Sequence, residues 1–320
     1  MRRRRLLAVI AAASLQSVPG RAQDRRIPTI GVLVVEVPGW EKFWRLFRTS
    51  MSDLDYVDGQ SVRYEFRSDH GEPSRLADLA SELVQLNVDL IVTWYTPPAQ
   101  AAKRATTHIP IVMALAGNPV ETGLVESLDR PGGNITGMAG SAAELAGKCM
   151  ELIREMLPSA RRVLALANAA DPFSRPFVEY VHNAGALTSF KVDTRMVQGK
   201  NDLEAAFDEI SKDPPDALIV QPSLPRRRIA ELAIAQEIAA VSVINGFVEE
   251  GGLMSYAPSE AEIYRRAAAI VDKILKGTKP SHIPVEQPTK FELLINMKTA
   301  KAIHLNIPSP LLARADVIIE

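Results

Sequence analysis

The chain has few of the residues that usually carry catalysis or bind metals. Cys149 is the only cysteine among 320 residues, so no disulfide can form within the chain. The five histidines are scattered and lack the spacing of a zinc site. The G-x-S-x-G, Walker A, H-E-x-x-H and C-x-x-C motifs are all absent. We therefore expect no enzyme activity, no catalytic residue, no metal and no cofactor, with Cys149 a buried, inert side chain.

The chain also lacks an excess of charge and a long apolar run. Its 37 Lys and Arg residues against 38 Asp and Glu residues give a net charge near −1, so neither nucleic acid nor an anionic membrane is an expected partner. Beyond the N-terminus, no run approaches the roughly 20 apolar residues that span a bilayer. We interpret the one cationic run, Arg226–Arg228, as a solvated surface, with an anion site as the alternative.

The N-terminus has the three parts of a secretory signal. Arg2–Arg5 are basic, residues 6–15 form a short apolar run, and Gly20 and Ala22 are small residues before a cut at Gln23. The sequence therefore predicts a signal peptide at residues 1–22 and a periplasmic mature protein. Export could use the Sec route or the Tat route, because the arginines also loosely fit a twin-arginine signal.

From residue 27 onward, short β-branched runs alternate with helical patterns. We expect strands at residues 29–35, 62–66, 90–93, 111–114, 135–138, 163–167, 191–197, 217–220, 241–244, 253–256 and 291–295. We expect helices at residues 41–54, 74–86, 99–106, 142–156, 173–187, 203–211, 226–239 and 260–276. Several strands are continuous apolar runs, which is typical of parallel strands covered on both faces.

This alternation predicts an α/β fold of two doubly wound parallel-sheet lobes joined by a multi-strand hinge. About ten strands are many for one such sheet, so we expect two sheets of about five. We assign residues 27–138 plus 257–281 to lobe I and residues 139–256 plus 282–320 to lobe II. Ligands bind outside the carboxyl ends of such strands, so a ligand cleft is expected between the lobes.

In lobe I, the first candidate ligand contacts follow the strand at residues 90–93. Thr96 and Pro97 open a helix whose N–H groups suit a ligand carboxylate, although Thr96 could also be a plain helix cap. Tyr95 could stack on a flat ligand or pack between the lobes. Trp40, near the loop before the first helix, is a further stacking candidate.

The next candidates are polar residues and glycine at other strand ends. Gly117 permits close approach of a ligand to the backbone, and Asn118 offers both a donor and an acceptor, but the pair could equally form a turn. In lobe II, Asn168 ends the strand at residues 163–167 and is a polar ligand candidate. We interpret the nearby Asp171 as a helix cap.

The remaining candidates also belong to lobe II. Phe173 could face the cleft or the core, and Tyr256 could touch ligand or pack in the hinge. Gln221 follows the strand at residues 217–220, and an amide and an aromatic ring follow the strand at 241–244 as Asn245 and Phe247.

Five segments carry a resemblance to a known family. They are GNPVETGLVESLDRPGGNITG (117–137), ELAGKCMELIREMLP (144–158), GFVEEGGLMSYAPS (246–259), QPTKFELLINMKTAKAIHL (287–305) and SPLLARADVIIE (309–320). With them the chain resembles the exported substrate-binding proteins of ABC transporters, in the subfamily described as binding tryptophan, tyrosine or related ligands. The resemblance implies a type I periplasmic-binding-protein fold that closes on a ligand without catalysis.

The resemblance also implies a function and its partners. We expect a periplasmic solute-binding component of an ABC importer, a monomer that delivers a small amino-acid-like or aromatic ligand to the permease. The alternative is a periplasmic sensor of the same fold that feeds a membrane receptor. Family members commonly carry an aspartate where Asn118 stands and another in the turn of Gln221. Both departures point away from a plain α-amino acid.

Overall fold

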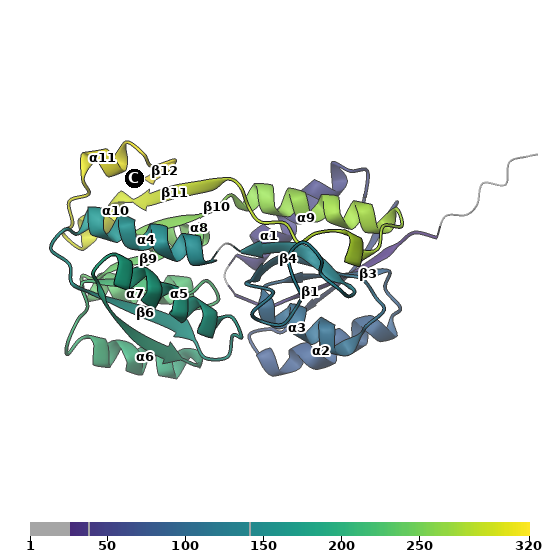
Figure 1. Ribbon diagram of the computed structural model, residues 1–320, viewed down its shortest axis with the longest axis horizontal. Helices are drawn as coiled ribbons and strands as arrows, with labels where there is room; N and C mark the ends of the chain where they lie inside the picture. The colour runs from purple at the N-terminus through teal and green to yellow at the C-terminus, as the bar shows by residue number, and fades with distance from the viewer. Residues whose placement is uncertain (1–25, 38, 141) are drawn as a thin grey trace, which may run out of the picture.

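The structure, a computed structural model, describes residues 26–37, 39–140 and 142–320, which form two lobes side by side (Figure 1). Lobe I is built on a five-stranded sheet of order β2-β1-β3-β4-β5, and lobe II on a seven-stranded sheet of order β12-β11-β10-β9-β8-β6-β7. The predicted α/β fold with two parallel-dominated sheets is thus confirmed, although five strands are found only in lobe I. The predicted signal peptide, residues 1–22, lies outside the described residues.

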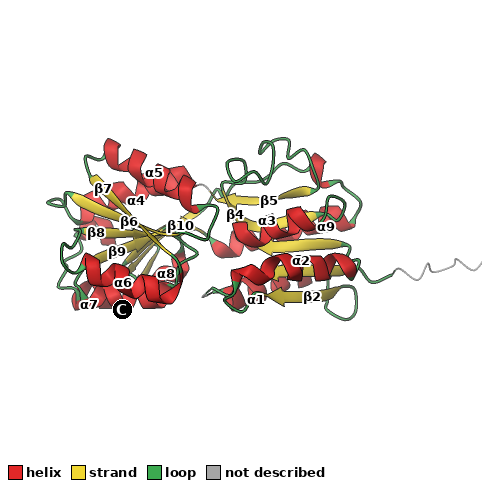
Figure 2. Cartoon of the chain, turned by 90° about the horizontal axis from the view of Figure 1, so that it is seen from below, coloured by secondary structure: helices red, strands yellow, loops and turns green. Residues whose placement is uncertain are grey.

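In lobe I, parallel strands alternate with helices that cover both faces of the sheet (Figure 2). The elements are β1 (Thr29–Val34), α1 (Trp40–Ser52), β2 (Arg63–Ser68), η1 (Pro73–Arg75), α2 (Leu76–Gln85), β3 (Leu90–Trp94), α3 (Thr96–Ala105), β4 (Ile111–Gly117), β5 (Ile135–Gly140) and α9 (Glu260–Leu275). Helix α1 packs beside α9, and α2 packs beside α3. The buried residues of α1, Phe43, Phe47 and Met51, recur every four positions and so form one apolar face.

In lobe II, the strand residues alternate between two apolar layers. Val163, Ala165 and Ala167 of β6 belong to the layer with α4 and α5, whereas Leu164 and Leu166 belong to the layer with α6 and α7. The elements are α4 (Ala142–Met156), β6 (Arg162–Asn168), α5 (Ser174–Leu187), β7 (Lys191–Val197), α6 (Gly199–Ile210), β8 (Ala217–Val220), α7 (Arg226–Ala235), β9 (Ala239–Ser242), α8 (Asn245–Glu249), β10 (Met254–Pro258), β11 (Phe291–Asn296), α10 (Met297–Ala302), α11 (Ser309–Leu312) and β12 (Val317–Ile319).

The chain passes between the lobes three times. It leaves lobe I after β5, returns between β10 and α9, and leaves again between α9 and β11. The last passage contains the short helix η2 (Pro280–His282). Residues 283–286, which the sequence analysis assigns to lobe II, run beside β5 of lobe I, where the backbone N–H of Ala139 donates to the carbonyl of Glu286 at 2.8 Å. Several chain segments therefore join the lobes.

Five short elements differ from the sequence-based expectations. Strand β9 ends at Ser242, two residues before its predicted end, and helix α8 begins at Asn245. Helices α10 and α11 and strand β12 have six, four and three residues, too few for hydrophobic periodicity to reveal them. Strand β11 runs antiparallel to β10 and parallel to β12. The pairing of β10 with β11 and of β11 with β12 extends the second sheet to seven strands. Such pairing between distant segments cannot be read from a local sequence pattern.

The described residues contain no helix long and apolar enough to cross a membrane. They also contain no group of three or more His, Cys, Asp or Glu side chains placed to hold a metal ion. Cys149 is fully buried, and burial raises the pKa of its thiol to about 12. A thiol of that pKa stays protonated at neutral pH and is a poor nucleophile.

An aromatic cluster fixes α9 to the centre of lobe I. The rings of Phe43 and Trp94 stack with centroids 5.3 Å apart, and Tyr264 of α9 meets Phe43 edge-on at 5.1 Å. The indole N–H of Trp94 donates to the Tyr264 hydroxyl at 3.1 Å, and both side chains are about 1% exposed. The hydroxyl therefore satisfies a buried donor that water does not reach.

We expect Tyr264→Phe to lower the free energy of unfolding by about 1–3 kcal/mol, because it leaves the Trp94 N–H buried without an acceptor. Urea denaturation followed by tryptophan fluorescence measures this change. Tyr56→Phe is the matched control, since the half-buried Tyr56 hydroxyl also donates to α9, at Asp272. Equal losses of unfolding free energy in the two variants would contradict the expectation that the buried bond between Trp94 and Tyr264 contributes more than the bond between Tyr56 and Asp272.

Candidate functional site

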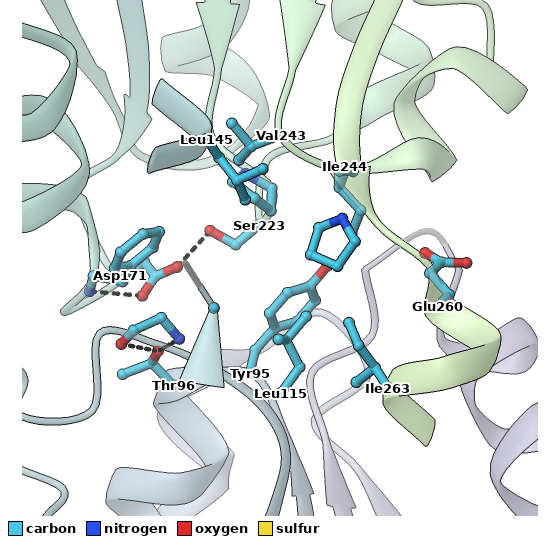
Figure 3. A pocket seen from close by; sticks show the side chains of 16 residues that line it. Tyr95, Thr96, Leu115, Leu145, Asp171, Ser223, Val243, Ile244, Glu260 and Ile263 are labelled. Carbon is cyan, nitrogen blue, oxygen red and sulfur yellow. Dashed lines mark hydrogen bonds between the residues drawn. The ribbon is translucent and has the colours of Figure 1, made fainter. Parts of the chain in front are cut away.

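A cavity lies between the lobes at the carboxyl ends of strands from both sheets (Figure 3). Its empty volume, including the part open to solvent, is about 640 Å³. We call it the inner cavity. It is lined by Tyr95, Thr96, Leu115, Gly117, Gly140, Leu145, Asp171, Phe173, Pro222, Ser223, Val243, Ile244, Ala257, Pro258, Glu260 and Ile263.

A second, larger cavity adjoins the first. We call it the outer cavity; its empty volume is about 1410 Å³, again including open solvent. Asp171 and Ser223 line both cavities and therefore mark the place where they meet. The outer cavity is lined by Val35, Glu36, Val37, Asp69, Gly71, Pro73, Ser74, Pro97, Asn168, Ala170, Asp171, Val197, Gln198, Gly199, Leu203, Ser223, Leu224 and Pro225.

The fold explains why these residues meet. In lobe I, Tyr95 and Thr96 directly follow β3, and Gly117 ends β4. In lobe II, Asp171 follows β6 and Ser223 follows β8. Because the carboxyl ends of parallel strands lie at one edge of a sheet, each lobe contributes one polar edge to the cavity wall.

Tyr95 and Thr96 are held firmly at the start of α3. Tyr95 has φ +75° and ψ 170°, a strained conformation for any residue except glycine. The Thr96 hydroxyl accepts a hydrogen bond from the Gly117 N–H at 3.1 Å. Pro97 and Pro98 are the next two helical residues and have no N–H. Among the first three residues of α3, only Thr96 therefore has a backbone N–H that can donate to a ligand. A helix N-terminus that binds a carboxylate usually offers several such N–H groups.

Asp171 is the buried acid of the inner cavity. Its Oδ1 accepts from the Phe173 N–H at 2.9 Å, and its Oδ2 accepts from Ser223 Oγ at 2.7 Å and Gln221 Nε2 at 2.9 Å. Burial raises the pKa of its carboxyl group. The interpretation of Asp171 as a helix cap is wrong, because Phe173 is the N-cap residue of α5 and the Asp171 carboxylate accepts from an N–H that precedes the helix. Gln221 itself is fully buried and holds this carboxylate rather than lining either cavity.

Arg226 is a buried cation between the lobes, not part of a solvated run as expected. It is 1% exposed, donates to the Tyr95 hydroxyl at 2.8 Å across the lobe boundary, and lies 3.7 Å from the carboxylate of Glu250. Burial raises the pKa of Tyr95 to about 12. The buried residues of α7 are Arg226, Ile229, Ala230 and Ala233. This spacing places Arg226 on the apolar face, a signal that the sequence analysis overlooked.

Other contacts also join the two lobes. The Phe173 ring packs so closely on Gly117 that a Cβ at that position would lie 2.3 Å from the ring. Tyr180 of α5 accepts from the Asn118 amide and donates to Glu121 at 2.6 Å. These contacts show that the described conformation has the lobes together around the inner cavity.

The predicted site residues divide into three groups. Tyr95, Thr96, Gly117 and Phe173 line the inner cavity, and Pro97 and Asn168 line the outer cavity. Gln221 lines neither cavity but donates to Asp171. The other residues that line neither cavity are Trp40, Asn118, Asn245, Phe247 and Tyr256.

The residues outside the cavities have other partners. The Trp40 ring packs on Phe66 with centroids 5.4 Å apart, and the Tyr256 ring stacks on Phe291 at 5.7 Å. Asn245 is buried, donating to Glu292 and accepting from Ser255. Phe247 is fully buried against Gly252. Because β9 ends at Ser242 and α8 begins at Asn245, the residues after β9 that line the cavity are Val243 and Ile244 instead.

A cavity enclosed by two α/β lobes is a usual site for a small-molecule ligand. The sequence matches the family described as ABC transporter substrate binding protein over residues 29–319. The chain therefore belongs to this family of substrate-binding proteins, as its motifs suggest.

Known relatives extend this assignment. The chain is 27% identical over 292 residues to a protein named tyrosine-binding protein from Clostridioides difficile, covering 89% of this chain and 83% of that one. A structure described as an ABC domain in complex with L-Trp, from Streptococcus pneumoniae, has a TM-score of 0.85 at 26% identity and covers 92% of this chain and 100% of its own. A conserved domain protein from Vibrio cholerae has a TM-score of 0.87 at 24% identity, with the same coverage. The fold is that of type I periplasmic binding proteins.

We expect Gly117→Ala to favour separation of the lobes, because the new Cβ would overlap the Phe173 ring while overpacking costs about 1–3 kcal/mol. Small-angle X-ray scattering should show a larger radius of gyration than for the unmodified chain. Gly133→Ala is the control, because a Cβ there meets nothing within 4 Å. An unchanged radius together with a loss of unfolding free energy would show that the ring adapts without separation.

Proposed function

We propose that this protein is the periplasmic solute-binding component of an ABC importer. It captures a small amino-acid-like or aromatic ligand in the inner cavity and delivers it to the permease. The observation that carries this proposal is a cavity whose walls come from both lobes of a chain in the substrate-binding family. The chain acts as a monomer and performs no catalysis.

The lining of the inner cavity supports a ligand with an apolar or aromatic body. The rings of Tyr95 and Phe173 line it, together with aliphatic side chains such as Leu115, Leu145 and Ile263. The names of the two most informative relatives refer to tyrosine and L-Trp, both aromatic amino acids. The proposed ligand of this chain belongs to the same class of molecule or resembles it.

Hinge closure follows from the way the lobes are joined. Segments between lobes allow one lobe to rotate relative to the other, while the sheets themselves stay rigid. A ligand that touches both lobes binds the closed arrangement better than the open one and so shifts the equilibrium towards it. In the inner cavity, Tyr95, Thr96 and Gly117 would contact it from lobe I and Phe173 from lobe II, while Asn168 would contact a part that reaches the outer cavity.

The residues behind the cavity have supporting roles in this proposal. Gln221 fixes Asp171, and Asn118 stabilises the closed arrangement through Tyr180. Trp40, Asn245, Phe247 and Tyr256 act through packing and hydrogen bonds around the cavity. Pro97, at the outer cavity, borders the ligand entrance.

Isothermal titration with tryptophan, tyrosine, phenylalanine and related aromatic acids and amines tests the proposal. We expect saturable one-to-one binding by at least one compound, with a smaller radius of gyration on binding. Leu115→Trp should abolish it by filling the inner cavity, whereas Leu86→Trp should not, because Leu86 is a 49%-exposed surface residue. Failure of every compound to bind, or equal binding by Leu115→Trp, would contradict the proposal.

The partner is tested separately. Pull-down from a membrane extract should recover an ABC permease when the protein is loaded with its ligand. Recovery of a signalling receptor instead would favour the sensor alternative.

A further inference from the structure

The charged residues that line the two cavities are all acidic. Asp171 and Glu260 are the charged side chains of the inner cavity, and Glu36, Asp69 and Asp171 are those of the outer cavity. Neither lining contains a lysine, arginine or histidine among the described residues. A ligand in this cleft therefore enters surroundings that favour a positive charge over a negative one.

Two cations that contact residues of the inner cavity lining, Lys42 and Arg226, already have partners. Lys42 lies 2.8 Å from the Glu260 carboxylate and 2.6 Å from Glu249, so it offsets much of the charge of Glu260. Arg226 lies behind Tyr95, 1% exposed, with Glu250 nearby. Neither is placed to receive a ligand carboxylate without losing these contacts.

The start of α3 is also a poor carboxylate site. Helix N-termini bind anions through several free N–H groups. Here Pro97 and Pro98 supply none, and the Thr96 hydroxyl is engaged by Gly117. The Thr96-Pro97-Pro98 start of α3 therefore disfavours a ligand carboxylate, contrary to the expectation from the sequence.

Asp171 remains as a buried carboxylate that has only neutral partners among the described residues. Ser223, Gln221 and the Phe173 N–H use three of its roughly four lone-pair positions. One position on Oδ1 is left for a further donor at the wall between the inner and outer cavities (Figure 3). A cation there would offset the cost of burying this charge.

The environment on the two sides of Asp171 differs. The inner cavity is mostly apolar, with side chains such as Leu145, Val243 and Ile244, whereas the outer cavity contains Glu36 and Asp69. A molecule that fits both environments has an apolar body inside and its cationic group at the junction. Substituents on that group would point towards the outer cavity.

We propose that the ligand is an amine with an apolar body, and that its ammonium group at Asp171, rather than a carboxylate, is its main polar anchor. This inference rests on the proposed function, because it names the chemical class of ligand for the same cavity. Unlike the amino acids named for the two relatives, the ligand proposed here needs no carboxylate to bind.

Three ligands with one body separate the two charged groups. They are phenethylamine, phenylalanine and 3-phenylpropanoate, with the indole series tryptamine, tryptophan and indole-3-propanoate and the corresponding phenol series alongside. In at least one series, we expect the amine to bind about tenfold or more tightly than the acid, since a charge-assisted hydrogen bond exceeds the 1.4 kcal/mol of a tenfold change. Adding the carboxylate to the amine should not improve binding.

The outcomes distinguish this inference from the proposed function. Tighter binding of the acid, or an amino acid binding about tenfold better than its amine, would overturn the inference and leave the proposed function standing. No binding in any series would overturn both. Each result is obtained with the unmodified chain and does not depend on a variant that folds.

A matched pair of variants assigns the anchor. Asp171→Asn should lower affinity for the amine by about tenfold or more while changing affinity for the acid little. Asp216→Asn is the control, because Asp216 also accepts backbone N–H bonds in lobe II, at Arg161 and Arg162, but lines neither cavity. Equal losses for amine and acid in Asp171→Asn, or unchanged amine affinity, would contradict the role of Asp171.

Discussion

The structure depends on one geometric constraint: the carboxyl ends of two parallel sheets face each other. Every strand that contributes to the inner cavity does so where it ends, so residues as distant in sequence as Tyr95 and Ser223 share one wall. The helices that follow these strands then fix the side chains. The bond between Arg226 and Tyr95 extends this arrangement across the lobe boundary and keeps a buried cation satisfied.

The position of the buried acid determines which chemistry the cavity favours. The amide of Gln221, directly after β8, donates to Asp171 on the loop after β6. Gln221 therefore acts on the cavity wall by holding this carboxylate in place, although its own side chain lines neither cavity.

Periodicity and apolar runs predicted most of the fold, because burial on both faces of a parallel strand leaves a direct mark on the sequence. The candidate site residues depend on more than local pattern. Tyr95, Thr96, Gly117 and Phe173, proposed from their places near strand ends, line the inner cavity, whereas Asn118 donates to Tyr180 and Asn245 begins helix α8. Such outcomes depend on partners far away in the chain. Arg226 is different, since the apolar face of α7 already contained the clue.

The path of α9 has a consequence for how the chain acquires its structure. The aromatic cluster of lobe I includes Tyr264, so the core of the first lobe stays incomplete until residues after β10 are present. Contacts of such long sequence separation slow folding and leave apolar surface uncovered in the meantime. The lobe that comes first in the sequence is therefore not an autonomous folding unit, and a shortened chain ending before α9 would have no finished core.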